Sequence, residues 1–184
     1  MIGLASPAVP LSQPAREVVV VALGANLENP VQQVRDTCRR LRHAFPGGFH
    51  ASSLWSSSPV DCPPGAPPFV NAVTMFDEPP DLAPEALLEQ FQRWEREAGR
   101  PAIRGLNAPR PLDVDLIVFG RVRQSSPLLT IPHPRAHQRR FVLAPLAEIA
   151  PHLHPPGWEY DVATTLERLV SDEILARLGS ALTA

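Results

Sequence analysis

Residues 109–119 read PRPLDVDLIVF, and between Leu112 and Phe119 only two aspartates interrupt the apolar side chains. A run of this kind predicts a buried β-strand, and Gly120 predicts a turn at its end. Side chains alternate between the two faces of a strand, so Asp113 and Asp115 project to the same side of the sheet. This stretch therefore predicts a core strand that carries a pair of carboxylates.

Buried carboxylates need a compensating positive charge, because burial and mutual repulsion both disfavour their ionised forms. Magnesium suits such a pair, since it prefers oxygen ligands and completes its shell with phosphate oxygens and water. Arg110, together with Arg100 and Arg104 in the loop before it, could clamp a polyphosphate beside the metal. The spacing also allows a simpler interpretation, in which the aspartates form salt bridges at the end of the sheet.

Arginine is concentrated around this strand. All 17 basic residues are arginine, which excludes mechanisms that need a phosphate-loop or Schiff-base lysine. Residues 93–140 hold ten arginines against four acidic residues, although the whole chain has a net charge of −2. This distribution favours a local anionic ligand over a nucleic-acid surface, which usually needs a strongly basic domain. A solvated arginine-rich face is the alternative.

The composition limits the class of protein further. A chain of 184 residues fits one domain, and its 23 prolines favour fixed turns and long loops over a helical bundle. We expect residues 1–16 to form a disordered tail and residues 17–184 to form a single domain. No apolar run approaches the about 20 residues of a membrane span. Cys38 and Cys62 are too few for a disulfide scaffold, so we expect a cytoplasmic protein without membrane contact.

Periodicity and turn residues predict the order of elements. Strands are expected at residues 17–23, 49–57, 69–77 and 112–119. Helices are expected from Pro30, capped by Asn29, to Pro46; from Pro84 to Gly99; over 141–149 with an interruption at Pro145; and finally along Leu166, Leu169, Ile174, Leu175 and Leu178. This order is a split βαβ arrangement and predicts an α+β fold, a ferredoxin-like α/β sandwich with helices packed on a central, mostly antiparallel sheet.

Two further patterns suggest binding residues. Phe69 and Asn71 share one face of their strand and offer an apolar wall and an amide, which suits a flat heterocycle. His133 and His137 have the spacing of a zinc pair, but Pro134 disfavours a regular helical turn between them and no third ligand lies at a useful spacing.

Four segments together resemble one family, the hydroxymethyldihydropterin pyrophosphokinases of folate biosynthesis. They are ALGANL at residues 22–27, FVNA at 69–72, NAPRPLDVDL at 107–116 and LTIPHP at 129–134. The resemblance runs from Val18 to about Pro156, roughly three quarters of the chain. It implies a transferase that moves the diphosphoryl group of ATP to 6-hydroxymethyl-7,8-dihydropterin and releases AMP.

The resemblance also implies roles for particular residues. Asp113 and Asp115 would hold two magnesium ions, and Arg100 and Arg110 would stabilise charge on the transferred group. The ATP-binding positions are Gln92, Glu95, Arg100, Arg110, Thr130, His133 and Arg139. The pterin-binding positions are Ser57, Ser58, Val60, Phe69, Asn71, Asn107 and Phe141. Loops after Leu23, Ser57 and Gly99 would close over both substrates.

The chain departs from the family pattern in these loops. Leu106 and Ala102 stand where the family commonly has basic residues, and Arg104 could replace one of them. Asp61 stands at a usual glycine, and Pro111 at a position that is often threonine. The competing functions are a non-catalytic pterin- or nucleotide-binding module of the same fold and an arginine-rich RNA-binding protein. We expect a monomer that binds small-molecule substrates and no nucleic acid.

Overall fold

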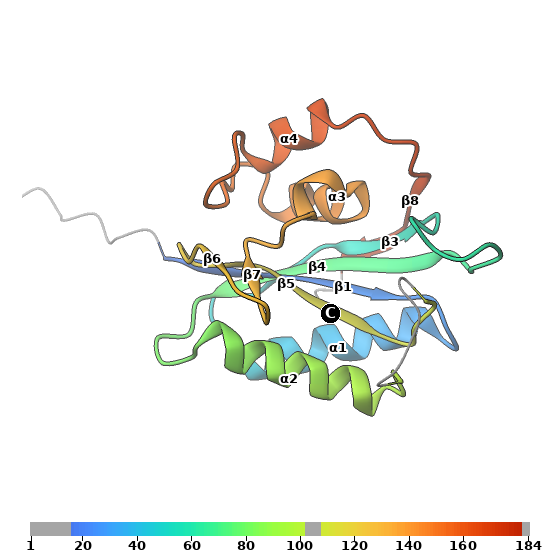
Figure 1. Cartoon of the computed structure of the whole chain (residues 1–184), viewed down its shortest axis with the longest axis horizontal. Coiled ribbons are helices and arrows are strands. Elements are labelled where there is room, and N and C mark those ends of the chain that lie inside the picture. The colour runs from blue at the N-terminus through green and yellow to red at the C-terminus, as the bar shows by residue number, and fades with distance from the viewer. Residues whose placement is uncertain (1–15, 102–107, 182–184) are drawn as a thin grey trace, which may run out of the picture.

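The computed structural model describes residues 16–101 and 108–181, in which an antiparallel sheet lies between two layers of helices (Figure 1). The strands of this sheet are β1 (Val18–Ala25), β2 (His50–Ala51), β3 (Ser53–Ser57), β4 (Phe69–Asp77), β5 (Asp113–Phe119) and β8 (Leu175–Ala181). The helices are α1 (Pro30–Ala44), α2 (Pro84–Glu97), α3 (Arg140–Ile149) and α4 (Val162–Arg168). A separate hairpin of β6 (Gln124–Ser125) and β7 (Thr130–Ile131) follows β5.

The strand order confirms the predicted fold class. The order is β5-β1-β4-β3-β8, and β2 and β3 follow one another along the same edge of β4. Helix α1 connects β1 to the β2–β3 edge, while β4 lies between them, which is the split βαβ arrangement. Neighbouring strands run antiparallel, as a ferredoxin-like α+β sandwich requires.

Alternation along β1 divides its side chains between two apolar cores. Val19, Val21 and Leu23 belong to the core beneath α1 and α2, whereas Val20 belongs to the core beneath α3 and α4. The run is therefore apolar throughout because both faces of the strand are covered. The helices lie on opposite sides of the sheet in Figure 1, α1 and α2 below and α3 and α4 above.

The helix starts follow local rules. Asn29 caps α1, and its side chain accepts a hydrogen bond from the Gln32 amide at 3.3 Å, as predicted. Pro84 opens α2, and Gly99 follows its end with a φ of +91°, a conformation that favours glycine. Among the residues that the structure describes, no helix is both long and apolar enough to cross a membrane.

A bulge in β5 positions the chain that follows it. Val20 pairs with Val118 and Val21 with Leu116, so Ile117 is an additional residue on β5. The Ile117 carbonyl accepts a hydrogen bond from the His133 amide at 2.9 Å. The bulge therefore ties the end of the β6–β7 hairpin to β5, two residues beyond Asp115.

Two predicted details of the helices are wrong. Helix α3 runs from Arg140 to Ile149 without the predicted interruption, although Pro145 lies inside it. Val142, Leu143 and Leu146 are buried against the sheet, and this packing outweighs the hydrogen bond that proline cannot donate.

The predicted C-terminal helix is a short helix followed by a strand. Helix α4 ends at Arg168, and residues Leu175–Ala181 form β8, which pairs with β3. The leucine spacing is compatible with an amphipathic helix, but Ile174 and Leu178 are exposed and so do not form the buried apolar face that such a helix needs. The free edge of β3 supplies backbone partners, and this tertiary pairing overrides the local pattern.

Candidate active site

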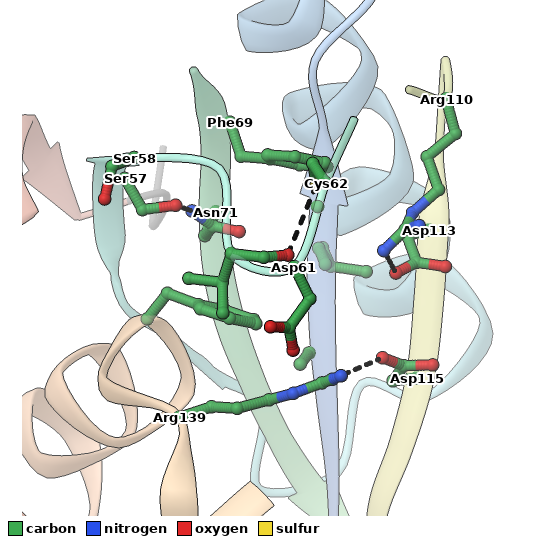
Figure 2. Close-up of a pocket in the computed structure, with 15 residues that line it drawn as sticks. Ser57, Ser58, Asp61, Cys62, Phe69, Asn71, Arg110, Asp113, Asp115 and Arg139 are labelled. Carbon is green, nitrogen blue, oxygen red and sulfur yellow. Dashed lines mark hydrogen bonds and ion pairs between the residues drawn. The ribbon is translucent and has the colours of Figure 1, made fainter. Parts of the chain in front are cut away.

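The floor of a hollow on the α3 side of the sheet is formed by two small residues of β1. Gly24 lies opposite Asp113 on β5 and opposite Asn71 on β4, and Ala22 lies opposite Asp115. A Cβ atom added at Gly24 would approach Asn71 Oδ1 to 3.4 Å. Because these β1 residues have little or no side chain, the β5 aspartates and the β4 amide face one open hollow (Figure 2).

The predicted pterin residues come together in this hollow. Those that line it are Ser57, Ser58, Val60, Phe69, Asn71 and Phe141. Phe69 and Asn71 share a face of β4, as the alternation predicted. The Asn71 side-chain amide donates a hydrogen bond to Ser57 Oγ at 2.9 Å, so the neighbouring strand orients it. Apolar walls with one oriented amide suit a flat, hydrogen-bonding ring.

Asp113 is paired on both of its oxygens. Arg100 Nη1 lies 2.8 Å from Asp113 Oδ1, and Arg110 Nη2 lies 2.6 Å from Asp113 Oδ2. The structure thus contains the salt bridges of the simpler interpretation. Arg110 Nε, however, is buried and has no hydrogen-bond acceptor among the described residues. A ligand oxygen would satisfy this donor.

Asp115 is less completely paired than Asp113. Among the described residues its side chain forms one ion pair, with Arg139, whose Nη1 lies 3.9 Å from Asp115 Oδ2. Burial and the negative charge of Asp113 raise the pKa of Asp115 to about 7, against the opposing effect of Arg139 and Arg110. A perturbed acid of this kind inside a hollow is typical of a functional site.

A second opening borders Asp115 on its other side. Its walls come from β5, from Leu88 on α2 and from residues 126–134, and they include Leu116, Leu129, Thr130 and His133. Thr130 and His133 are two of the predicted nucleotide residues. Since Asp115 lines both openings, a ligand in each would meet at this carboxylate.

His133 is held as a neutral donor. Burial, and then the charges of Arg139 and Arg135, lower the pKa of His133 to about 4. The Arg135 amide donates a hydrogen bond to His133 Nδ1 at 3.3 Å. A neutral ring that accepts at Nδ1 carries its proton on Nε2, and this N–H can donate to a ligand oxygen.

The remaining nucleotide candidates differ in their surroundings. Arg139 lines the first hollow beside Asp115. Gln92 lies exposed on α2. Glu95 is buried, accepts a hydrogen bond from the Val114 amide at 2.9 Å and pairs with Arg100. Glu95 therefore connects α2 to β5 and orients Arg100.

Several predicted positions lie outside the described residues: Ala102, Arg104, Leu106 and Asn107. The predicted closure of the loops likewise stays a prediction. Asp61 lines the mouth of the hollow and has a φ of +53°, the left-handed conformation that a glycine would adopt at little cost. Aspartate tolerates this conformation better than most residues, so the departure at Asp61 keeps a glycine-like backbone. Pro111 is buried beside Leu112.

Sequence reasoning missed Asn26, which joins three segments around the hollow. The backbone N–H of Asn26 donates a hydrogen bond to the Arg110 carbonyl at 3.1 Å, and the side-chain Oδ1 of Asn26 accepts one from the backbone N–H of Arg110 at 2.8 Å. Its Nδ2 donates to the Pro67 carbonyl at 3.1 Å. Asn26 stands in the segment ALGANL, but its hydrogen-bond partners are 41 and 84 positions away in the sequence. These contacts exist only in the folded chain, so the local sequence does not reveal them.

The residues present fit a magnesium ion that shares its shell with a ligand. Asp113 and Asp115 face one hollow, and the raised pKa of Asp115 reflects its burial and then repulsion from Asp113, both of which a bound cation would offset. Among the described residues no cluster of three or more His, Cys, Asp or Glu side chains could hold a metal by itself. Phosphate oxygens and water would complete the shell, as magnesium prefers. His137, the second residue of the zinc spacing, packs edge-on against Trp158.

Comparison with known proteins places the chain among pterin enzymes. Residues 20–151 match the 7,8-dihydro-6-hydroxymethylpterin-pyrophosphokinase family model. The 2-amino-4-hydroxy-6-hydroxymethyldihydropteridine pyrophosphokinase of Haemophilus influenzae is 34% identical over 162 residues, which cover 86% of this chain and 96% of that protein. The enzyme of the same name from Pseudomonas aeruginosa is 40% identical over 75% of this chain and 83% of its own length. The folic acid synthesis protein fol1 of Pneumocystis carinii is 34% identical, but this chain spans only 21% of it.

Solved structures show the same fold. The wild-type HPPK-DHPS of Plasmodium falciparum superposes with a TM-score of 0.63 over 86% of this chain and 45% of that chain, at 12% identity. The chain thus spans less than half of this longer protein, and at this identity the likeness concerns the fold. The family match over most of the sequence and the pyrophosphokinase relatives agree with the pocket geometry: the chain belongs to the 7,8-dihydro-6-hydroxymethylpterin-pyrophosphokinase family.

Proposed function

We propose that the hollow between β4 and β5 binds 6-hydroxymethyl-7,8-dihydropterin, that the second opening binds ATP, and that transfer takes place beside Asp115. The observation that carries this proposal is that Asp115 lines both cavities. The reaction is that of the family: the diphosphoryl group of ATP moves to the hydroxymethyl oxygen of the pterin, and AMP is released. The enzyme serves folate biosynthesis.

The pterin would lie between two aromatic walls that each carry an arginine. The Arg110 guanidinium lies 5.4 Å from the centroid of the Phe69 ring, and the Arg139 guanidinium lies 5.4 Å from that of Phe141. Asn71 would hydrogen-bond the ring edge, together with the backbone of residues 57–60. This arrangement brings cationic groups to the side of the ring where phosphates must arrive.

The base of ATP would occupy the second opening. Leu116 and Leu129 offer apolar surface for a flat base, and Thr130 offers a hydroxyl. The Nε2–H group of His133 would donate to a phosphate or sugar oxygen. Gln92 and Glu95 remain candidate nucleotide-binding residues by resemblance. Glu95 would act through its ion pair with Arg100.

The arginines would stabilise the charge that develops during transfer. Arg100 and Arg110 are held in place by Asp113, so their guanidinium groups are positioned before substrate arrives. The unpaired Nε of Arg110 would gain a phosphate oxygen as its acceptor. Asp113 and Asp115 would hold the magnesium, two ions by resemblance. When bound, magnesium supplies the positive charge that neutralises the triphosphate and activates the pterin hydroxyl.

A chromatographic assay tests this function. The protein is incubated with ATP, magnesium and 6-hydroxymethyl-7,8-dihydropterin, and AMP, ADP and pterin products are separated. We expect equal amounts of AMP and diphosphorylated pterin, and neither product with Asp113→Ala. Release of ADP would contradict the proposal. Pterin binding without turnover would favour the binding module, which the retention of Asp113, Asp115 and Arg110 argues against.

A further inference from the structure

A segment beyond the family match contacts both sides of the pterin hollow. The family model ends at residue 151, but β8 pairs along β3, with Leu175 opposite Ser57 and Ala176 opposite Ser56. Ser57 and Ser58 begin the loop that lines the hollow. Residues 173–177, here called the strap, thus extend the sheet at the edge where the pterin loop leaves it.

The strap holds Ser58 by two hydrogen bonds. The Ser58 amide donates to the Ile174 carbonyl at 3.0 Å, and the Ile174 amide donates to Ser58 Oγ at 3.1 Å. The Ile174 side chain is 75% exposed, so the contact with Ser58 is made by its backbone. These bonds fix the position of Ser58, the first residue of the loop after β3, and the Ser58 hydroxyl oxygen is already used as a hydrogen-bond acceptor.

The neighbouring residue of the strap holds the opposite wall. The Glu173 carboxylate accepts a hydrogen bond from the Phe141 amide at 3.0 Å. Phe141 lies in the first turn of α3, whose N-cap residue, Arg139, makes no side-chain capping bond. A carboxylate at this end satisfies a free amide and interacts favourably with the helix dipole. Glu173 therefore orients the helix end that presents Phe141 to the hollow.

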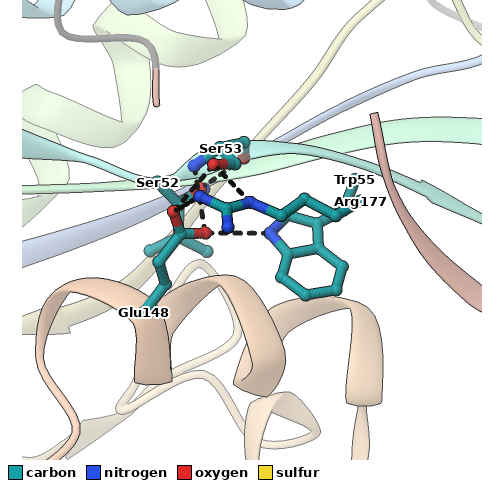
Figure 3. Close-up of polar contacts among 6 residues, drawn as sticks. Ser52, Ser53, Trp55, Glu148 and Arg177 are labelled. Carbon is teal, nitrogen blue, oxygen red and sulfur yellow. Dashed lines mark hydrogen bonds and ion pairs between the residues drawn. The ribbon is translucent and has the colours of Figure 1, made fainter. Parts of the chain in front are cut away.

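The strap is itself anchored by a polar cluster centred on the buried Ser53 (Figure 3). Arg177 donates to Ser53 Oγ at 2.8 Å and to Glu148 Oε1 at 2.8 Å. Glu148, on α3, also accepts from the Ser53 amide at 3.1 Å and from Trp55 Nε1 at 3.2 Å. The cluster joins β8, β3 and α3, so the two ends of the strap are held to the same elements that carry the pterin walls.

We propose that Glu173 and the Ile174 backbone are positioning groups for the pterin pocket, which set the distance between the Ser58 loop and Phe141. This inference rests on the proposed function, because it assigns the hollow to the pterin. Neither residue lines the opening proposed for ATP. Loss of their contacts should therefore weaken pterin binding more than ATP binding.

Glu173 is tested with two substitutions and a matched control in the full chain. Glu173→Ala removes the acceptor, whereas Glu173→Gln keeps an oxygen that can accept from Phe141. Glu167→Ala removes an exposed carboxylate from α4. We expect Glu173→Ala to raise the Kd for 6-hydroxymethylpterin about tenfold, measured by its fluorescence, and Glu173→Gln to recover most of this loss. The Kd for ATP with magnesium should change less than about twofold in every variant.

Ile174 supplies an independent test. Ile174→Pro removes the amide that donates to Ser58 Oγ, and Ile174→Ala leaves the backbone intact. We expect weaker pterin binding only for the proline variant, about threefold or more. Should that variant not fold, the Glu173 series still decides the question.

The outcomes separate the two proposals. Equal loss of pterin and ATP affinity in Glu173→Ala, or no loss in either, would overturn the positioning role. If the wild-type protein bound pterin but released no AMP, the proposed reaction would fail, while the pattern of pterin affinities would still support or contradict the strap.

Discussion

Two carboxylate clusters lie on the α3 side of the sheet and differ in how fully they are paired. Glu148 accepts from the Ser53 amide, the Ser53 hydroxyl and Trp55, and pairs with Arg177. Asp115 has Arg139 at 3.9 Å and a repelling neighbour in Asp113. A carboxylate whose donors are complete stabilises the fold, whereas one left short of positive charge can take up a ligand that brings it.

The strongest test of this difference is Asp115→Asn. We expect the rate of AMP formation at saturating substrates to fall on the order of a thousandfold, because an amide cannot supply the negative charge that would hold the proposed magnesium ion. The measurement is AMP release by chromatography. Activity within tenfold of wild type would remove Asp115 from the reaction.

The converse substitution is Glu148→Ala. It removes the ion-pair partner of Arg177 and leaves the buried Ser53 amide and the Trp55 N–H without their acceptor, so the free energy of unfolding should fall by about 2 kcal/mol. Urea denaturation measures this change. The value of kcat at saturating pterin and ATP should stay within about twofold, and a loss of kcat as large as that of Asp115→Asn would erase the distinction between the clusters.

The pH dependence of stability should carry a smaller signature of Asp115. The pKa of Asp115 is about 7 in the folded chain, against an ordinary value of 3.8. At pH values between these two, the folded state therefore binds more protons than the unfolded state. Stability without magnesium should therefore fall as the pH rises from about 4 to 7. Asp115→Asn should remove this slope and be more stable by about 1 kcal/mol at pH 8, a value reduced because the Asp115 side chain is 35% exposed to solvent. Identical urea midpoints at pH 8 would contradict the assignment.

An exposed ion pair provides the lower limit of the comparison. Arg121 Nε lies 2.6 Å from Glu17 Oε1, and the Arg121 side chain is 83% exposed. We expect Glu17→Ala to change the free energy of unfolding by less than about 0.5 kcal/mol and to leave AMP formation unaltered. A larger change in urea denaturation would show that an ion pair can stabilise this fold without being buried, which would contradict the comparison.

Local patterns predicted the parts of the molecule whose partners are close in sequence or follow strand alternation. Asp113 and Asp115 face one hollow because side chains two apart on a strand share a face, and the same rule placed Phe69 beside Asn71. Helix α1 began at its predicted cap for a similarly local reason. The roles of the site residues came from resemblance and remain proposals.

Other features depend on distant partners and left no local signal. The spacing of Leu166, Leu169 and Leu178 is compatible with a helix, and only the free edge of β3 makes the last part a strand. In the sequence Glu148 looks like an ordinary surface residue of a short helix, yet it accepts a hydrogen bond from Ser53, which lies 95 positions away. Such pairings are set by tertiary contacts that periodicity does not encode.

The pairing of β8 with β3 has a consequence for the order in which the protein is made. Ser58 and Ile174 are separated by 116 positions, so the ribosome completes β3 long before its partner strand exists. During that interval the edge of β3 is an unpaired template that other nascent chains could join. The contacts of residues 173–177 with Ser58 and Phe141, at the edge of the proposed pterin pocket, thus form late in translation, and a chaperone that shields β3 would act in this interval.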